Sequence, residues 1–129
     1  MDTDNKALIE HSHLENGANL YLYDASRTMI GDRMLVTLFV RVEITAESID
    51  GSDGLPSADE IRSALGDPVT WEYTKQRRFI DSREKDDVFK ALQADFDANM
   101  RPYISHPGFP AGCVRRRMKE LQQPGRRRV

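Results

Sequence analysis

The strongest pattern of hydrophobic and polar positions lies between residues 34 and 45. Every even position there is apolar, whereas the odd positions include Arg41, Glu43 and Thr45. A period of two residues places alternate side chains on opposite faces of a β-strand, so that one face is buried and the other meets solvent. The pattern therefore predicts one long strand, whose apolar face is made by Met34, Val36, Leu38, Val40, Val42 and Ile44.

Two shorter segments also have strand-like patterns. Residues 19–24 alternate leucine with tyrosine, and residues 69–73 place Val69, Trp71 and Tyr73 at alternate positions. Aromatic and β-branched residues favour strands because their side chains pack well on a pleated surface. We predict one strand in each segment.

The sequence leaves the pairing of the first two strands open. Gly31 and Asp32 fit a two-residue hairpin turn. An uninterrupted hairpin would place Tyr23 opposite Val40 and turn the tyrosines towards the core. A bulge or loop within residues 25–33 would instead turn the leucines inward, because a shift of one residue exchanges the two faces of a strand.

Two segments carry the signature of a capping box, in which the residue that begins a helix and the residue three positions later satisfy each other's backbone amides. The first pair, Ser57 and Glu60, predicts a short helix that runs through Leu65 and ends at Gly66. Glycine is common just after a helix because it adopts the left-handed backbone conformation at little cost.

The second capping box, Asp81 and Glu84, predicts a helix of about five turns. Apolar residues recur in it at every fourth position, and they are Val88, Leu92, Phe96 and Met100. This spacing gives the helix one apolar face that can pack on a sheet. Pro102 should end this helix, and residues 114–121 are predicted to form a last helical segment.

This order of elements predicts an α+β fold in two layers. About three mainly antiparallel strands would form one layer, and the long amphipathic helix would pack on one face of them. The 129 residues are enough for one hydrophobic core. We expect a flexible N-terminal segment over residues 1–17, a single α+β domain over residues 18–121 and a basic C-terminal tail over residues 122–129.

Charge is distributed unevenly along the chain. Residues 101–129 hold eight basic residues and one acid, whereas the first hundred residues hold 11 basic and 20 acidic residues. Such a split indicates either a basic arm that binds a polyanion or a tail that pairs with an acidic body. Guanidinium groups bind phosphate through two hydrogen bonds. The candidate polyanion-binding residues are Arg115, Arg116, Arg117, Lys119, Arg126, Arg127 and Arg128.

A second candidate surface depends on the pairing left open above. If the tyrosines of the first strand point away from the helix, they join Leu35 and Phe39 in an exposed apolar patch. Such a patch usually contacts a partner or a second copy of the chain, and two-fold dimers are the commonest oligomers. The candidate interaction surface is therefore Tyr21, Tyr23, Leu35 and Phe39.

The chain lacks the usual motifs for catalysis and for cofactor binding. His11 and His13 have carboxylates beside them but no third soft metal ligand nearby, and no glycine-rich phosphate loop is present. Cys113 and His106 form the one possible thiol–imidazole pair, but a nucleophile also needs an orienting third group. We expect no metal, no cofactor and no catalytic residue.

The remaining features concern location and function. The first residues are acidic and lack the apolar stretch of a signal peptide, and a single cysteine excludes an internal disulfide bond. We expect a cytoplasmic protein without a membrane partner. The sequence favours a small non-catalytic interaction or adaptor module that binds a protein partner or itself as a homodimer. The alternative is a nucleic-acid-associated accessory protein that uses its C-terminal arginines.

Overall fold

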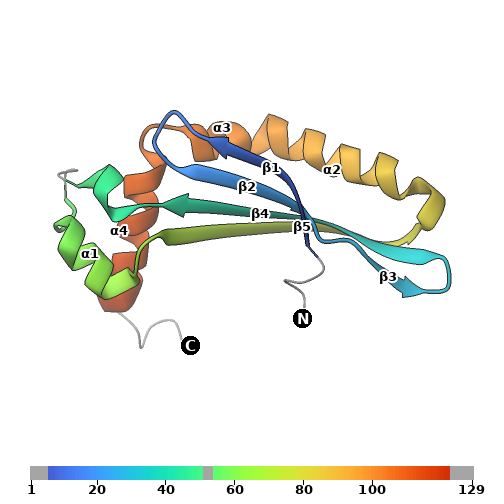
Figure 1. Cartoon of the computed structure of the whole chain (residues 1–129), viewed down its shortest axis with the longest axis horizontal. Coiled ribbons are helices and arrows are strands. Elements are labelled where there is room, and N and C mark those ends of the chain that lie inside the picture. The colour runs from blue at the N-terminus through green and yellow to red at the C-terminus, as the bar shows by residue number, and fades with distance from the viewer. Residues whose placement is uncertain (1–5, 51–53, 123–129) are drawn as a thin grey trace.

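The computed structural model describes residues 6–50 and 54–122 and has the predicted α+β fold (Figure 1). A five-stranded antiparallel sheet is combined with four helices, and the long helix α2 packs against the sheet. The strands are β1 (Ala7–His13), β2 (Asn19–Asp24), β3 (Arg27–Ile30), β4 (Arg33–Ile44) and β5 (Val69–Asp81). The helices are α1 (Ala58–Leu65), α2 (Lys85–Asn99), α3 (Arg101–Ser105) and α4 (Phe109–Gln122).

The long strand β4 organises the sheet. Strand β5 pairs along one edge of β4, while β2 and β3 pair with successive parts of its other edge. Strand β1 pairs with β2. Ala25 and Ser26 separate β2 from β3 but stay hydrogen-bonded to Thr37 of β4, so the register continues across the interruption.

The structure settles the pairing that the sequence left open. Ile30 lies opposite Arg33, as a two-residue turn requires, but Met29 is an extra residue in β3. This bulge moves the partner of Tyr23 from Val40 to Phe39. The leucines of β2 therefore point into the core, and its tyrosines point away from the helices.

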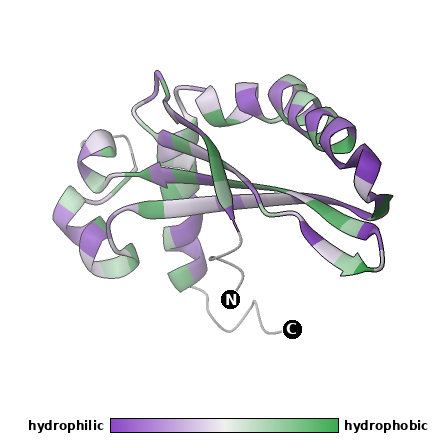
Figure 2. Ribbon diagram, turned by 45° about the vertical axis from the view of Figure 1, so that its right-hand side comes forward, coloured by the Kyte–Doolittle hydropathy of each residue, from purple (hydrophilic) through white to green (hydrophobic). Residues whose placement is uncertain are grey.

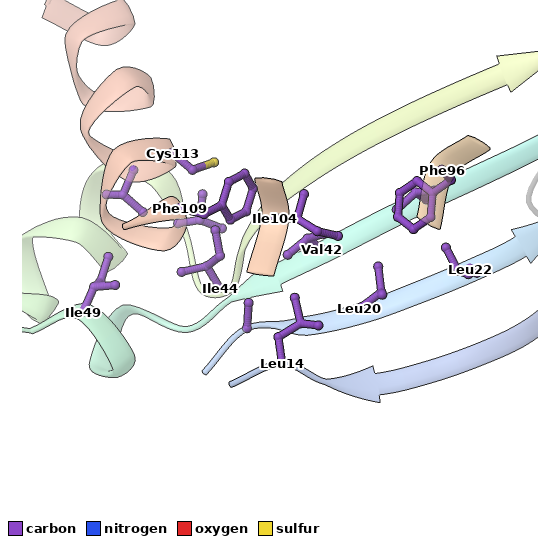
Figure 3. Close-up of a cluster of buried hydrophobic side chains, with 14 of the residues drawn as sticks. Leu14, Leu20, Leu22, Val42, Ile44, Ile49, Phe96, Ile104, Phe109 and Cys113 are labelled. Atoms are coloured by element: carbon purple, nitrogen blue, oxygen red, sulfur yellow. The ribbon is translucent and has the colours of Figure 1, made fainter. Parts of the chain in front are cut away.

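The core lies between the sheet and the helices (Figure 3). The even-numbered residues of β4 from Val36 to Ile44 are buried there with Leu20 and Leu22 of β2. Helix α2 buries Phe89, Leu92 and Phe96, and Figure 2 shows hydrophilic and hydrophobic residues on different sides of this helix. The predicted four-residue spacing thus identified the buried side of α2.

Four elements differ from the expected boundaries. Residues 7–13, which we had assigned to a flexible segment, form β1, and β5 continues eight residues beyond Tyr73 to Asp81. The side chain of Asp81 accepts from the Arg83 amide and caps a 3-10 turn rather than α2 itself. Helix α4 begins at Phe109 and so includes Pro110, which a first helical turn tolerates because an amide at that position would have no partner within the helix.

Within the described ranges, no helix has the length and hydrophobicity needed to span a bilayer. Helices α2 and α3 lie along one side of the sheet, and α1 and α4 lie at one end of it (Figure 1). We call the opposite side the uncovered face. It carries the odd-numbered residues of β4 from Leu35 to Glu43, together with Tyr21 and Tyr23 of β2.

Candidate functional site

The uncovered face holds the four residues that the sequence suggested as an interaction surface. Tyr23 lies opposite Phe39 in the sheet, with ring centroids 5.8 Å apart. Tyr21, Tyr23 and Phe39 are half-buried, and Leu35 is 6% exposed. The structure therefore brings these side chains to one side of the sheet, although Leu35 contributes little exposed surface.

Cationic and aromatic side chains cover part of these rings. The Lys6 Nζ atom lies 4.1 Å from the centroid of Phe39 and 5.1 Å from that of Tyr23. The His11 ring stacks on Tyr21 at 4.4 Å with an interplanar angle of 7°. Cations over aromatic rings are held by the negative potential of the ring face. The surface is thus a mixture of aromatic and cationic groups rather than a bare apolar patch.

A pocket of about 280 Å³ lies in the middle of this face. Leu35, Thr37 and Phe39, at alternate positions of β4, contribute to its lining. Segments far apart in the sequence supply the rest, and these residues are Lys6, Ala25, Arg27, Thr74 and Gln76. The pocket is concave, and most of its lining side chains come from the paired strands β3, β4 and β5, which hold them in fixed positions.

The charges around the pocket are unbalanced. Lys6 and Arg27 line it, and none of the described lining residues is acidic. Neither cation makes an ion pair within the described part of the chain, whereas Arg41 on the same face lies 3.5 Å from Glu72. Among the described residues, the two positive charges of the pocket therefore have no acidic partner.

One buried polar group of the pocket has no hydrogen-bond partner among the described residues. Thr37 is 5% exposed, and its hydroxyl oxygen Oγ1 makes no hydrogen bond to any described residue. A buried hydroxyl without a partner costs about 1–3 kcal/mol of stability. Such a group is unusual in a well-packed protein and points to a place where a ligand can complete the hydrogen bonding.

The predicted polyanion-binding residues fall into three groups. Arg115, Arg116 and Lys119 are exposed on α4. Arg117 is half-buried, and its guanidinium donates to the carbonyl oxygen of Thr70 at 3.0 Å, so it ties α4 to the start of β5. Arg126, Arg127 and Arg128 lie outside the described residues.

The thiol–imidazole pair is not arranged for nucleophilic chemistry. Cys113 is 4% exposed, and burial raises the pKa of its thiol despite the nearby charges of Arg116 and Arg117. A thiol with a raised pKa stays protonated and unreactive at neutral pH. The Nδ1 atom of His106 accepts from the Gly108 amide at 2.9 Å. Cys113 therefore acts as a core residue.

The side chains of the two N-terminal histidines contact different residues. His11 stacks on Tyr21, while Nδ1 of His13 lies 3.0 Å from Oδ1 of Asn19. Across residues 6–50 and 54–122 there is no group of three or more histidine, cysteine, aspartate or glutamate side chains that could hold a metal ion.

Known proteins provide no guide to the role of this face. No protein-family model, no curated protein and no solved structure matches the chain.

The sequence did not indicate the pocket. Arg27 belongs to residues 25–33, whose pairing the sequence left open. Lys6 and Gln76 belong to segments whose place in the sheet was unknown. One signal was present, because Leu35, Thr37 and Phe39 share a strand face. The residues on either side depend on strand pairing and bulges that the sequence does not fix.

Proposed function

We propose that this protein is a small cytosolic, non-catalytic interaction module that binds another protein through the uncovered face of its sheet. The observation that carries the proposal is the pocket beside Tyr23 and Phe39, on the side of the sheet that the described helices leave free. Aromatic residues and arginine are enriched at protein interfaces, and concave sites on rigid strands provide shape for recognition.

The rigidity of this face supports binding rather than a mobile catalytic loop. Its side chains come from β2, β3, β4 and β5, which are paired along their lengths. A pre-formed surface loses little conformational entropy when a partner docks. Half-buried rings such as Tyr23 and Phe39 can bury further area without reorganising.

A pair of matched charge changes tests the proposal. Phe39→Glu introduces an acid into the centre of the uncovered face, whereas Lys90→Glu introduces one on the exposed side of α2. Tagged wild-type protein and both variants are recovered from source cells, and the proteins that co-purify are identified and then reconstituted with purified components. We expect direct binding to be lost in Phe39→Glu and kept in Lys90→Glu. Equal binding by all three would overturn the proposal.

A second copy of the chain is one specific occupant. Light scattering coupled to size exclusion separates this case, because a dimer of the wild type that becomes a folded monomer in Phe39→Glu would identify the partner as the chain itself. A monomer at all concentrations directs the search to a different protein.

The exposed basic side chains of α4 favour nucleic-acid binding as a second candidate function. Arg115, Arg116 and Lys119 are exposed on one short helix. Binding through phosphates weakens steeply with salt. Replacing these three residues with glutamine should abolish a salt-dependent retention of single- or double-stranded DNA or RNA. Retention that is unchanged in the variant, or at 0.5 M salt, would contradict this function.

A further inference from the structure

We propose that the pocket on the uncovered face binds the side-chain carboxylate of an acidic residue in the partner protein. This inference rests on the proposed function, because it assigns a ligand chemistry to the surface through which the module would bind. It is carried by the charges, the polar groups and the size of the pocket.

The first argument is charge complementarity. Lys6 and Arg27 line the pocket without an acidic partner in the described chain. Some other cations of the sheet do have one, since Arg33 lies 3.8 Å from Asp81 and Lys75 lies 2.7 Å from Asp95. A guanidinium group can hold a carboxylate through two parallel hydrogen bonds. A carboxylate is thus the counter-charge that the described residues do not supply to this pocket.

The second argument is the supply of hydrogen-bond donors. Gln76 offers amide donors and Thr74 offers a hydroxyl at the wall of the pocket. Thr37 contributes the buried hydroxyl that has no partner among the described residues. A carboxylate oxygen at the base of the pocket would accept from these groups, after a small local adjustment to reach the Thr37 hydroxyl.

The third argument is size. About 280 Å³ is at the lower limit for pockets that hold drug-sized ligands, but it accommodates one amino-acid side chain. Leu35 and Phe39 provide apolar contacts for methylene groups. The pocket therefore matches the size of a glutamate or aspartate side chain that enters it from a partner polypeptide lying across the sheet.

The same face argues against an extended polyanion. Glu43 and Glu72 lie on the same side of β4 and β5 as the pocket, and the side chain of Glu72 is 51% exposed. A nucleic-acid backbone along the strands would meet these acids, and like charges in contact disfavour binding. A single carboxylate that enters the pocket avoids them.

The test uses a small probe whose binding does not require the partner. Isotope-labelled protein is titrated with N-acetylglutamate α-amide and, separately, with the neutral N-acetylglutamine α-amide, while backbone amide signals are followed by NMR. We expect the glutamate probe to move signals of residues 25–27, 35–39 and 74–76 to saturation. The glutamine probe should leave them in place. Glutamine shifts of equal size would overturn the proposal.

Two variants and one control locate the binding. Arg27→Gln and Lys6→Gln should each weaken glutamate binding about tenfold, in keeping with the loss of a charged hydrogen-bond donor. Lys90→Gln removes an exposed charge from α2 and should leave the affinity unchanged. Unchanged binding in Arg27→Gln would overturn the assignment. If inorganic phosphate moves the same signals at lower concentration than the glutamate probe, the pocket is a phosphate site and the carboxylate proposal is wrong.

The two proposals fail in different ways. Partner binding that is lost in Phe39→Glu, with no response to the glutamate probe, would overturn the carboxylate site and leave the interaction face in place. A glutamate response that depends on Arg27, with partner binding unaffected by Phe39→Glu, would support the pocket and overturn the proposed interface.

Discussion

Arg101, the first residue of α3, forms a two-point ion pair with Glu10 of the edge strand β1. Both guanidinium nitrogens Nη1 and Nη2 lie 3.1 Å from a carboxylate oxygen of Glu10, and Nε also donates to Asp97 at 2.9 Å. Edge strands have one unpaired side and need additional contacts to stay in place. This pair links β1 to the junction between α2 and α3, which explains how a polar N-terminal segment becomes part of the sheet.

The ion pair predicts a dependence of stability on pH. The hydrogen bonds from Arg101 lower the pKa of Glu10 against the opposing effect of burial. The folded state therefore binds a proton less readily than the unfolded state, so the contribution is present above the unfolded pKa, near 4.5, and is lost as pH falls through the lower, folded pKa. We expect Glu10→Gln to lower the free energy of unfolding by about 1 kcal/mol at pH 7.

Urea denaturation at a series of pH values checks this expectation. The difference between the wild type and Glu10→Gln should shrink as pH falls below about 4.5. Glu15→Gln is the control, because Glu15 is exposed and such changes usually stay within about 0.5 kcal/mol. A constant difference between pH 7 and pH 3 would show that the carboxylate charge is not the source of the stabilisation.

Thr37 predicts a conflict between stability and binding. Its hydroxyl is buried and has no partner in the described chain, so replacing it with a methyl group removes a desolvation cost. Thr37→Val should therefore raise the free energy of unfolding by about 1 kcal/mol, while it weakens the response to the glutamate probe. Thr74→Val, at an exposed position of β5, should change stability much less. A less stable Thr37→Val protein would mean that the hydroxyl is satisfied in solution.

Helix α1 gives a test in which the same substitution, serine to alanine, should have different effects on stability at the start and in the middle of the helix. Ser57 Oγ accepts from the Glu60 amide, and the Glu60 carboxylate accepts from the Ser57 amide, so the capping box is complete. Ser57→Ala should lower stability by about 1 kcal/mol. Ser63→Ala, in the exposed middle of the same helix, should be neutral or slightly stabilising because alanine is the better helix former. Equal effects in thermal denaturation would rule out the cap as the cause.

Local signals in the sequence were reliable guides to the fold. Ser57 and Glu60 identified α1 to the residue, and the alternation around Val40 identified β4 and its buried face. These signals depend on neighbours within four positions, which the sequence displays directly. The spacing of Leu92 and Phe96 succeeded for the same reason.

Features that depend on contacts between residues far apart in the sequence could not be predicted from such local signals. The register of β2 depends on one extra residue, Met29, and nothing in the sequence distinguishes a bulge there from a longer turn. The pocket combines residues near positions 6, 26, 37 and 75, and their meeting depends on four strand pairings. The ion pair of Glu10 with Arg101 joins residues 91 positions apart.

Phe79 adopts a backbone conformation that is unusual for its residue type. It lies in β5 with φ +58°. A bulge at this point places two residues of β5, Arg78 and Phe79, opposite the single residue Leu35 of β4. A side chain with a Cβ atom costs about 1–2 kcal/mol in the left-handed region, because Cβ approaches the following carbonyl oxygen. The ring is 60% exposed, so it recovers little of this cost by burial.

Two substitutions separate the backbone cost from the contribution of the ring. Phe79→Ala removes the ring and keeps Cβ, whereas Phe79→Gly removes both and relieves the strain. We expect the glycine variant to be more stable than the alanine variant by about 1 kcal/mol, the reverse of the usual order of these residues in strands. Urea denaturation of both proteins measures the difference. If alanine proves the more stable, residue 79 does not hold a positive φ in solution, and the bulge must then relax into the regular ladder with a one-residue shift of Ile80 and Asp81 against β4.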